Sequence, residues 1–120
     1  MSIVDELGKY LAGMLQGVNV SQGLMPAEPA RCTMVRGTDL NPSGEDGARV
    51  QIIVRGDNSP FVALGDAEEI AVMLDGFEGL LAYEGRYVNR ITIENGPAHI
   101  GVDQNGRQEY TINIRIFYCD

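Results

Sequence analysis

Side chains that could carry out catalysis are few and scattered in this sequence of 120 residues. His99 is the single histidine, and no Gly-x-Ser-x-Gly or Cys-x-x-Cys motif accompanies it. Cys32 and Cys119 add only two further ligands of the kind that zinc prefers, which is too few for a typical site. Lys9 follows a glycine, but Tyr10 stands where a phosphate-binding loop needs Ser or Thr. We therefore expect no enzyme, no cofactor and no metal, with an enzyme that uses His99 together with Asp103 or Glu94 as a minor alternative.

One segment begins like a calcium-binding loop. Asp39, Asn41, Ser43 and Gly44 match the first positions of an EF-hand, but Val50 stands where a bidentate glutamate is required. The composition of residues 37–47 instead predicts a flexible loop with Glu45 and Asp46 at its tip.

Composition sets the class of the chain. With 44% apolar and 22% charged residues, it has the balance of a globular protein, and we expect a single domain over residues 1–120. The net charge of −8 argues against electrostatic binding to a nucleic-acid backbone. No apolar run is long enough to span a membrane, and the N-terminus lacks the basic and apolar pattern of a signal peptide. Without a secretion signal, two free thiols are favoured over a disulfide, which the sequence does not exclude.

Two helices and several strands must position any functional surface. Apolar residues at helical spacing predict a first helix over residues 2–16, and a capping signal at residues 57–60 begins a second. Residues 18–29 are expected to be irregular. Strands are expected at 31–36, 48–55, 87–94, 99–103 and 108–118, with turns at 95–97 and 105–106.

This order predicts an α+β fold. We expect a mainly antiparallel sheet of four to five strands, with two amphipathic helices packed on one face. The short strands 31–36 and 99–103 are the expected sheet edges, where another subunit could join. Arginines flank the strands (Arg36, Arg49, Arg55, Arg90 and Arg115), which suits a protein that pairs with copies of itself, although solvated arginines on a sheet explain the pattern equally well.

Three stretches carry a resemblance to a known family. They are IVDELGKYLAGMLQG near the N-terminus, ARVQIIVRGDNSPFVALGDAEEIAVMLDG over residues 48–76, and NGRQEYTINIRIFY over residues 105–118. Their pattern and order, over about residues 3 to 118, resemble the tail terminator and minor capsid proteins of tailed bacteriophages.

The resemblance implies an assembly role in the virion. Such proteins form a ring, usually a hexamer, on the last ring of the tail tube, stop its polymerisation and present a surface to the head connector. It implies self, the tail tube protein and the head connector protein as partners, with DNA passing through unbound. It also implies a place in the tail or neck of the virion, and in the host cytoplasm during assembly.

The resemblance and the charged residues in and around the loop over 37–47 lead to a hypothesis about contact residues. The loop over 37–47 matches a family segment that often contacts other subunits or the tube. We therefore expect a subunit or tube interface at Arg36, Asp39, Glu45, Asp46 and Arg55. The alternatives are a head–tail connector stopper or head-completion protein, and a small cytoplasmic module that binds a ligand between helices and sheet.

Overall fold

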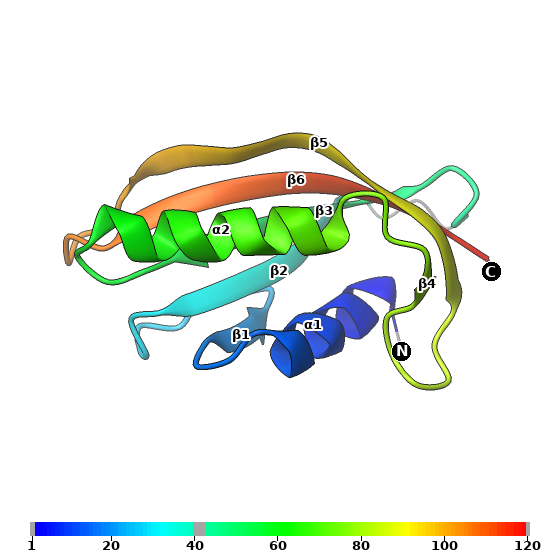
Figure 1. The fold of residues 1–120 in the computed structure, drawn as a ribbon, viewed down its shortest axis with the longest axis horizontal. Coiled ribbons are helices and arrows are strands. Elements are labelled where there is room, and N and C mark those ends of the chain that lie inside the picture. Colours follow the sequence, from blue (N-terminus) through cyan, green and yellow to red (C-terminus); the bar gives the residue numbers. More distant parts are fainter. Residues whose placement is uncertain (1, 40–42, 120) are drawn as a thin grey trace.

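The computed structural model describes residues 2–39 and 43–119, which form two helices and six strands (Figure 1). The strand order in the sheet is β1-β2-β3-β6-β5-β4; β1 runs parallel to β2, and the other neighbouring pairs are antiparallel. The α+β class is confirmed, but the sheet is mixed and has six strands, not four to five. The elements are α1 (Ile3–Met14), β1 (Asn19–Gln22), β2 (Cys32–Asp39), β3 (Ala48–Arg55), α2 (Pro60–Leu74), β4 (Gly79–Leu80), β5 (Tyr87–Val102) and β6 (Gln108–Tyr118).

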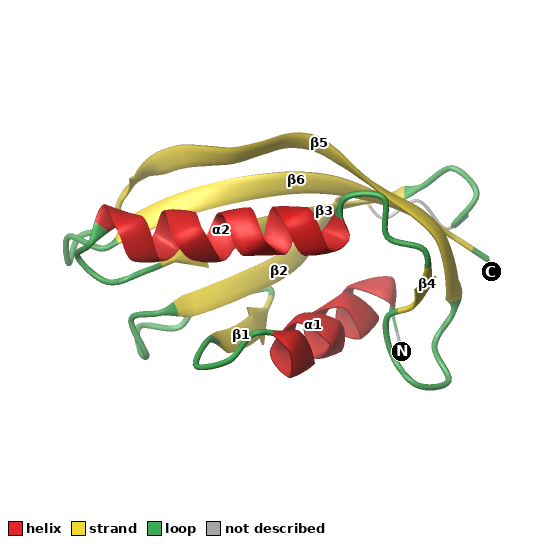
Figure 2. Cartoon of the chain, in the orientation of Figure 1, coloured by secondary structure: helices red, strands yellow, loops and turns green. Residues whose placement is uncertain are grey.

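Both helices begin where the sequence predicts, because a serine caps each of them. The Ser2 hydroxyl accepts a bond from the Asp5 backbone N–H (3.1 Å), and the Asp5 carboxylate accepts one from the Ser2 N–H (3.0 Å). Ser59 accepts from the Phe61 N–H at 3.3 Å, directly before Pro60 at the first helical position. Figure 2 shows both helices lying on the same side of the sheet. Helix α1 contacts β1 and β2, and α2 contacts β3, β5 and β6.

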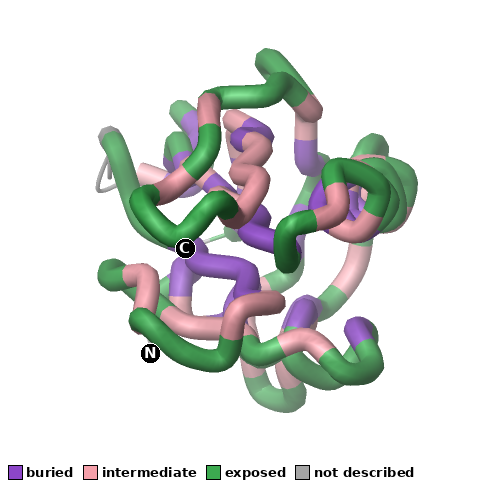
Figure 3. Tube along the Cα trace, turned by 90° about the vertical axis from the view of Figure 1, so that its left-hand side faces the viewer, coloured by how far each residue is buried: buried purple, intermediate pink, exposed green. Residues whose placement is uncertain are grey.

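The core fills the space between the helices and the sheet. Register explains its composition, since Ile52 lies opposite Ile112 and Val50 lies opposite Ile114, so these side chains share the helix-covered face. Figure 3 shows the buried segments gathered toward the interior. The core includes Leu7 and Leu11 from α1, Ala67, Ile70 and Leu74 from α2, and Val35, Ile91 and Ile116 from the sheet.

Two buried carboxylates fix the helices to distant parts of the chain. Glu6 is 1% exposed and accepts two bonds from Arg86, one from its backbone N–H and one from its guanidinium, both at 2.8 Å. Asp66 is 5% exposed and accepts a bidentate pair from Arg31 at 2.7 and 2.8 Å. The hydrogen bonds that Arg31 donates to the Asp66 carboxylate raise the pKa of the guanidinium. These pairs join α1 to the segment before β5, and α2 to the segment before β2.

The predicted turn at residues 95–97 is wrong. The chain continues through it as one strand, β5, and absorbs the irregularity by register shifts against β6 between Ile93 and Asn95 and between Asn95 and Ala98. Gly96 has φ of 96°, and a Cβ there would overlap the Thr111 carbonyl oxygen. The residues that favour a turn thus produce bulges in a long strand.

The sheet edges also differ from the prediction. Strand β1, in a segment expected to be irregular, pairs with residues 32–35, so the strand expected over 31–36 is not the edge there. At the other side, β4 covers only Tyr87 and Val88 of β5. Residues 93–102 have no outer strand neighbour within the described chain, which agrees with the edge expected at 99–103. Bulges and Pro97 make this edge poorly suited to pairing with another strand, because they disrupt the regular row of hydrogen-bonding groups that strand pairing needs.

Candidate assembly surfaces

By register, the sheet face opposite to the helices carries five of the nine cationic side chains, and one of them, Arg55, is buried. Arg36 lies on β2, Arg49 on β3, Arg90 on β5 and Arg115 on β6. Because paired residues on antiparallel strands share a face, Arg49 and Arg115 lie side by side, and Arg115 lies beside Thr92. We refer to Arg36, Arg49, Arg90 and Arg115 as the arginine face.

Hydrogen bonds across the strands order the polar side chains on this face. The Arg36 Nε donates to Gln51 Oε1 at 2.8 Å, and the Gln51 amide donates to the Thr111 hydroxyl at 3.2 Å. Asn113 and Asn95 are joined in the same way at 3.2 Å. The polar row spans β2, β3, β6 and β5, so it presents an ordered surface.

The cations of the arginine face are only partly neutralised. Arg49 lies 3.4 Å from a Glu94 carboxylate oxygen, and the Arg115 guanidinium lies over the Phe117 ring at 5.5 Å. Among the described residues, Arg36, Arg90 and Arg115 have no carboxylate oxygen within 4.0 Å. No described residue forms a hydrogen bond with the buried Nε of Arg115. The face therefore keeps capacity to bind carboxylates from another molecule.

The five predicted contact residues lie in two separate places. Arg36 and Asp39 are on β2, and Glu45 and Asp46 are exposed in the turn over 43–47 that leads into β3. Arg55 is at the other end of β3, since it pairs with Cys32 while Arg49 pairs with Asp39. Six residues along a strand correspond to about 20 Å. Arg36, Asp39, Glu45 and Asp46 therefore lie near one end of the β2–β3 pair, and Arg55 lies at its other end.

The loop predicted over 37–47 is shorter than expected, because β2 continues to Asp39. Residues 40–42 lie outside the described part of the chain, as do residues 1 and 120 of the predicted domain. The described part, 43–47, packs on the C-terminal strand: the Tyr118 N–H donates to the Gly44 carbonyl at 3.0 Å. A Cβ on Gly44 would overlap Tyr118, so this turn has a fixed position against β6.

Arg55 is buried, not presented to a partner. It is 4% exposed and donates to three backbone carbonyls, of Ala30 and Pro29 at 2.8 Å and of Ala27 at 3.5 Å. These bonds hold the segment before β2 against the sheet. Burial gives Arg55 a role inside the monomer, and its place in a subunit contact stays an untested prediction.

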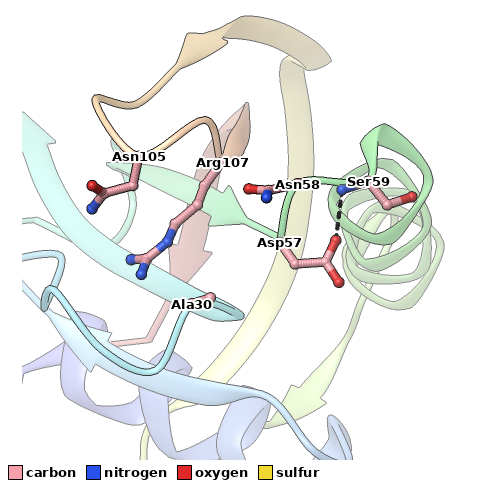
Figure 4. A pocket seen from close by; sticks show the side chains of 6 residues that line it. All are labelled: Ala30, Asp57, Asn58, Ser59, Asn105 and Arg107. Carbon is pink, nitrogen blue, oxygen red and sulfur yellow. Dashed lines mark hydrogen bonds between the residues drawn. The ribbon is translucent and has the colours of Figure 1, made fainter.

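A hollow of about 610 Å³ lies where the segment before β2 meets the β3–α2 connection and the β5–β6 hairpin (Figure 4). Arg107, on its wall, donates to the Ala27 carbonyl and to the Glu28 carboxylate, so its charge is already paired. Because five of the six lining residues are polar, the hollow does not match the apolar pocket of a ligand-binding module. The lining residues are Ala30, Asp57, Asn58, Ser59, Asn105 and Arg107.

Titratable groups beside this hollow are engaged in holding the hairpin. Asp103 accepts bonds from the backbone N–H groups of Arg107 (2.9 Å) and Asn105 (2.8 Å), and these bonds lower the pKa of its carboxyl. Burial, and then the charge of Asp103, raise the pKa of Glu109. His99 bonds to the Gln108 amide at 2.8 Å and packs edge-on against Tyr110. Among the described residues, His99 forms no hydrogen bond or ion pair with Asp103 or Glu94, the acids suggested for an enzymatic role.

Comparison with protein families matches residues 9–118 to the family described as bacteriophage tail terminator protein. The chain belongs to the bacteriophage tail terminator family. A search of curated proteins found no match. The match confirms the predicted resemblance and makes this terminator a structural component of the phage tail or neck.

Membership of a structural family favours a protein without enzymatic activity. The residues described here contain no group of three His, Cys, Asp or Glu side chains arranged to hold a metal ion. None of their helices is long and apolar enough to cross a membrane. Cys32 is a buried free thiol and Cys119 an exposed one, as predicted.

The sequence reasoning missed one surface of the terminator. The outward side of α2 combines acidic residues with two large exposed apolar side chains, Phe61 (79% exposed) and Val72 (82% exposed). Positions 61, 65, 68, 72 and 75 follow helical spacing, so they form one stripe opposite the buried Ala63, Ala67 and Ile70. The acidic stripe, as we refer to it, consists of Phe61, Gly65, Glu68, Glu69, Val72 and Asp75.

Proposed function

We propose that this terminator forms a ring, a hexamer, on the last ring of the tail tube, stops its polymerisation there and provides the surface to which the head attaches. The single observation that carries the proposal is the family match, which covers residues 9–118 of the 120. The partners are further copies of the chain, the tail tube protein and the head connector protein. Assembly takes place in the host cytoplasm, and the ring joins head and tail as a minor capsid component.

The mechanism is capping. A ring subunit that binds the tube end with one surface and presents a different surface outward ends a polymer of identical rings, because the next tube ring finds no match. The proposed contacts toward the tube or a neighbouring subunit are Arg36, Asp39, Glu45 and Asp46, of which Arg36, Glu45 and Asp46 are exposed.

Charge is compatible with the passage of DNA through the ring. With 17 acidic and 9 basic side chains, the subunit repels a polyanion overall. An acidic bore would let DNA move without binding, since binding to the nucleic-acid backbone requires clustered cations.

A tube-growth assay tests the proposal. The tail tube protein of the same phage is allowed to polymerise with and without this chain, and tube lengths are measured by electron microscopy. Shorter tubes with this chain at one end only support the terminator function. Unchanged growth, with binding to the head connector alone, would instead assign the chain as a connector stopper or head-completion protein.

A further inference from the structure

The apolar character of α2 on both sides points to a second contact for this helix. Its inner side is buried on the sheet, whereas Phe61 and Val72 stand largely exposed on the outer side. A surface helix of a monomer normally places polar residues on this side, and here Phe61 and Val72 flank the exposed carboxylates of Glu68 and Glu69. The acidic stripe is thus suited to be covered by another protein surface.

Charge identifies the kind of surface that fits it. Glu68, Glu69 and Asp75 are exposed, and none has an ion pair within 4.0 Å among the described residues. The arginine face of the same chain carries unpaired charges of the opposite sign, since Arg36, Arg90 and Arg115 have no carboxylate oxygen within 4.0 Å in residues 2–39 and 43–119. The half-buried Phe117 and Ile53 lie among them and can receive apolar side chains.

The two surfaces cannot meet within one molecule. Helix α2 lies on one side of the sheet (Figures 1 and 2), and the acidic stripe is on the side of α2 opposite to its buried residues. By strand register, the arginine face is on the other side of the sheet. A contact between them therefore joins two copies head to tail. Contacts of this kind between different surfaces form closed rings when the rotation between neighbours closes.

The edge of the sheet is a weaker candidate for the contact. Along residues 93–102 the edge strand carries three register shifts and Pro97, which disturb a continuous ladder with another strand. Contact through faces avoids this obstacle, because it uses side chains and not the backbone of β5.

We propose that the acidic stripe of one subunit packs on the arginine face of the next, and that this heterologous contact builds the ring. The inference rests on the ring assembly proposed above and names the two surfaces that form it. The acidic residues pair with arginines, and Phe61 and Val72 pack among the apolar side chains of the partner's sheet face.

Charge exchange in the phage tests the contact. Two double variants, R36E/R90E and E68R/E69R, and the chain that combines all four changes, are supplied to a phage that lacks the gene. Each double variant places like charges across the contact, so we expect the titre of infectious particles to fall at least tenfold. The combined variant restores opposite charges and should regain most of the titre.

Controls separate assembly from folding. K9E and E84R reverse exposed charges outside both surfaces and should leave the titre unchanged, and thermal unfolding of each purified variant should match that of wild type. Wild-type titres for both double variants, or a combined variant no better than either, would overturn the contact.

Cross-linking gives a readout that does not require folding of charge-reversed chains. A photoreactive phenylalanine at position 72 is expressed in infected cells, and the same group at Tyr83, which is 89% exposed and outside the acidic stripe, is the control. We expect position 72 to link to residues on the arginine face of a second copy, on β2, β3, β5 or β6, and position 83 not to do so. Links from position 72 to other surfaces only, or no dimer at all, would overturn the proposal.

The outcomes distinguish this contact from the proposed function. If loss of the gene leaves tail length unchanged, the terminator function fails, while the cross-link at position 72 still decides the contact. If tails become overlong without the gene but the charge variants behave as wild type, the function stands and the contact is wrong.

Discussion

Replacement of Glu6 by glutamine should destabilise the fold strongly. The carboxylate is buried and receives two donors from Arg86, one on each oxygen. Glutamine keeps one acceptor oxygen and turns an NH₂ group toward the other donor, so one charge-assisted bond is lost and the other becomes a neutral one. Such bonds contribute about 1.5–3 kcal/mol each when a charged group takes part, against about 1 kcal/mol for neutral pairs.

The Arg86 side chain is 37% exposed and regains part of its hydration, which reduces the expected loss to about 2–3 kcal/mol of unfolding free energy. For a domain of this size the midpoint of thermal unfolding should fall by roughly 10 °C. Urea unfolding followed by circular dichroism measures the change, and Glu69→Gln is the matched control. Glu69 is exposed with no ion pair among the described residues, so its change should stay within about 0.5 kcal/mol.

A double-mutant cycle with Arg86→Met identifies the cause. If the bonds between these two residues carry the loss, the coupling free energy should exceed about 1 kcal/mol. A Glu6→Gln cost below about 1 kcal/mol, or additive effects in the cycle, would refute the role assigned to this buried pair.

Further substitutions test the hairpin, the bulge and the arginines. Gly96→Ala should cost about 3 kcal/mol, because its positive φ and the overlap with the Thr111 carbonyl both disfavour a Cβ, and urea unfolding would show a smaller loss if the bulge rearranges. Asp103→Asn mimics the protonated carboxyl. Because folding lowers the pKa of Asp103, wild type should be more stable than the variant at pH 7 and should lose that advantage as the pH falls through the folded pKa. A stability difference that does not depend on pH would contradict this. Arg55→Met should cost about 3 kcal/mol by leaving buried carbonyls without a donor, whereas Arg36→Met should stay within about 0.5 kcal/mol in the same assay, and equal effects would contradict their different placement.

Local signals predicted most of the elements correctly. Both helices and the strands β3 and β6 combine regular periodicity with recognisable ends, such as the caps Ser2 and Ser59, so local and tertiary preferences agree. The turn at residues 95–97 failed because Asn, Gly and Pro favour turns and bulges alike, and pairing with β6 decides between them. Strand β1 was missed because four residues without alternation carry no periodic signal. The local pattern of residues 19–22 also does not reveal that they pair with residues 32–35 of β2.

The candidate surfaces were predictable only in part. Arg36 and Arg55 both follow apolar residues in a strand, and no local feature reveals that the segment before β2 folds over one of them and not the other. The acidic stripe, by contrast, was available from the sequence. Phe61 and Val72 are eleven residues apart, which is close to three helical turns, and a helical projection places them together on the side away from the core.

Disruption of the gene in the parent phage tests the central claim most directly. Lysates of the mutant are imaged by negative-stain electron microscopy, with and without the chain supplied from a plasmid, and tail lengths are measured. We expect overlong tails without heads that return to one uniform length on complementation. Tails of ordinary length beside unattached heads would contradict termination and indicate a connector or completion protein, and intact virions would contradict a role in phage assembly.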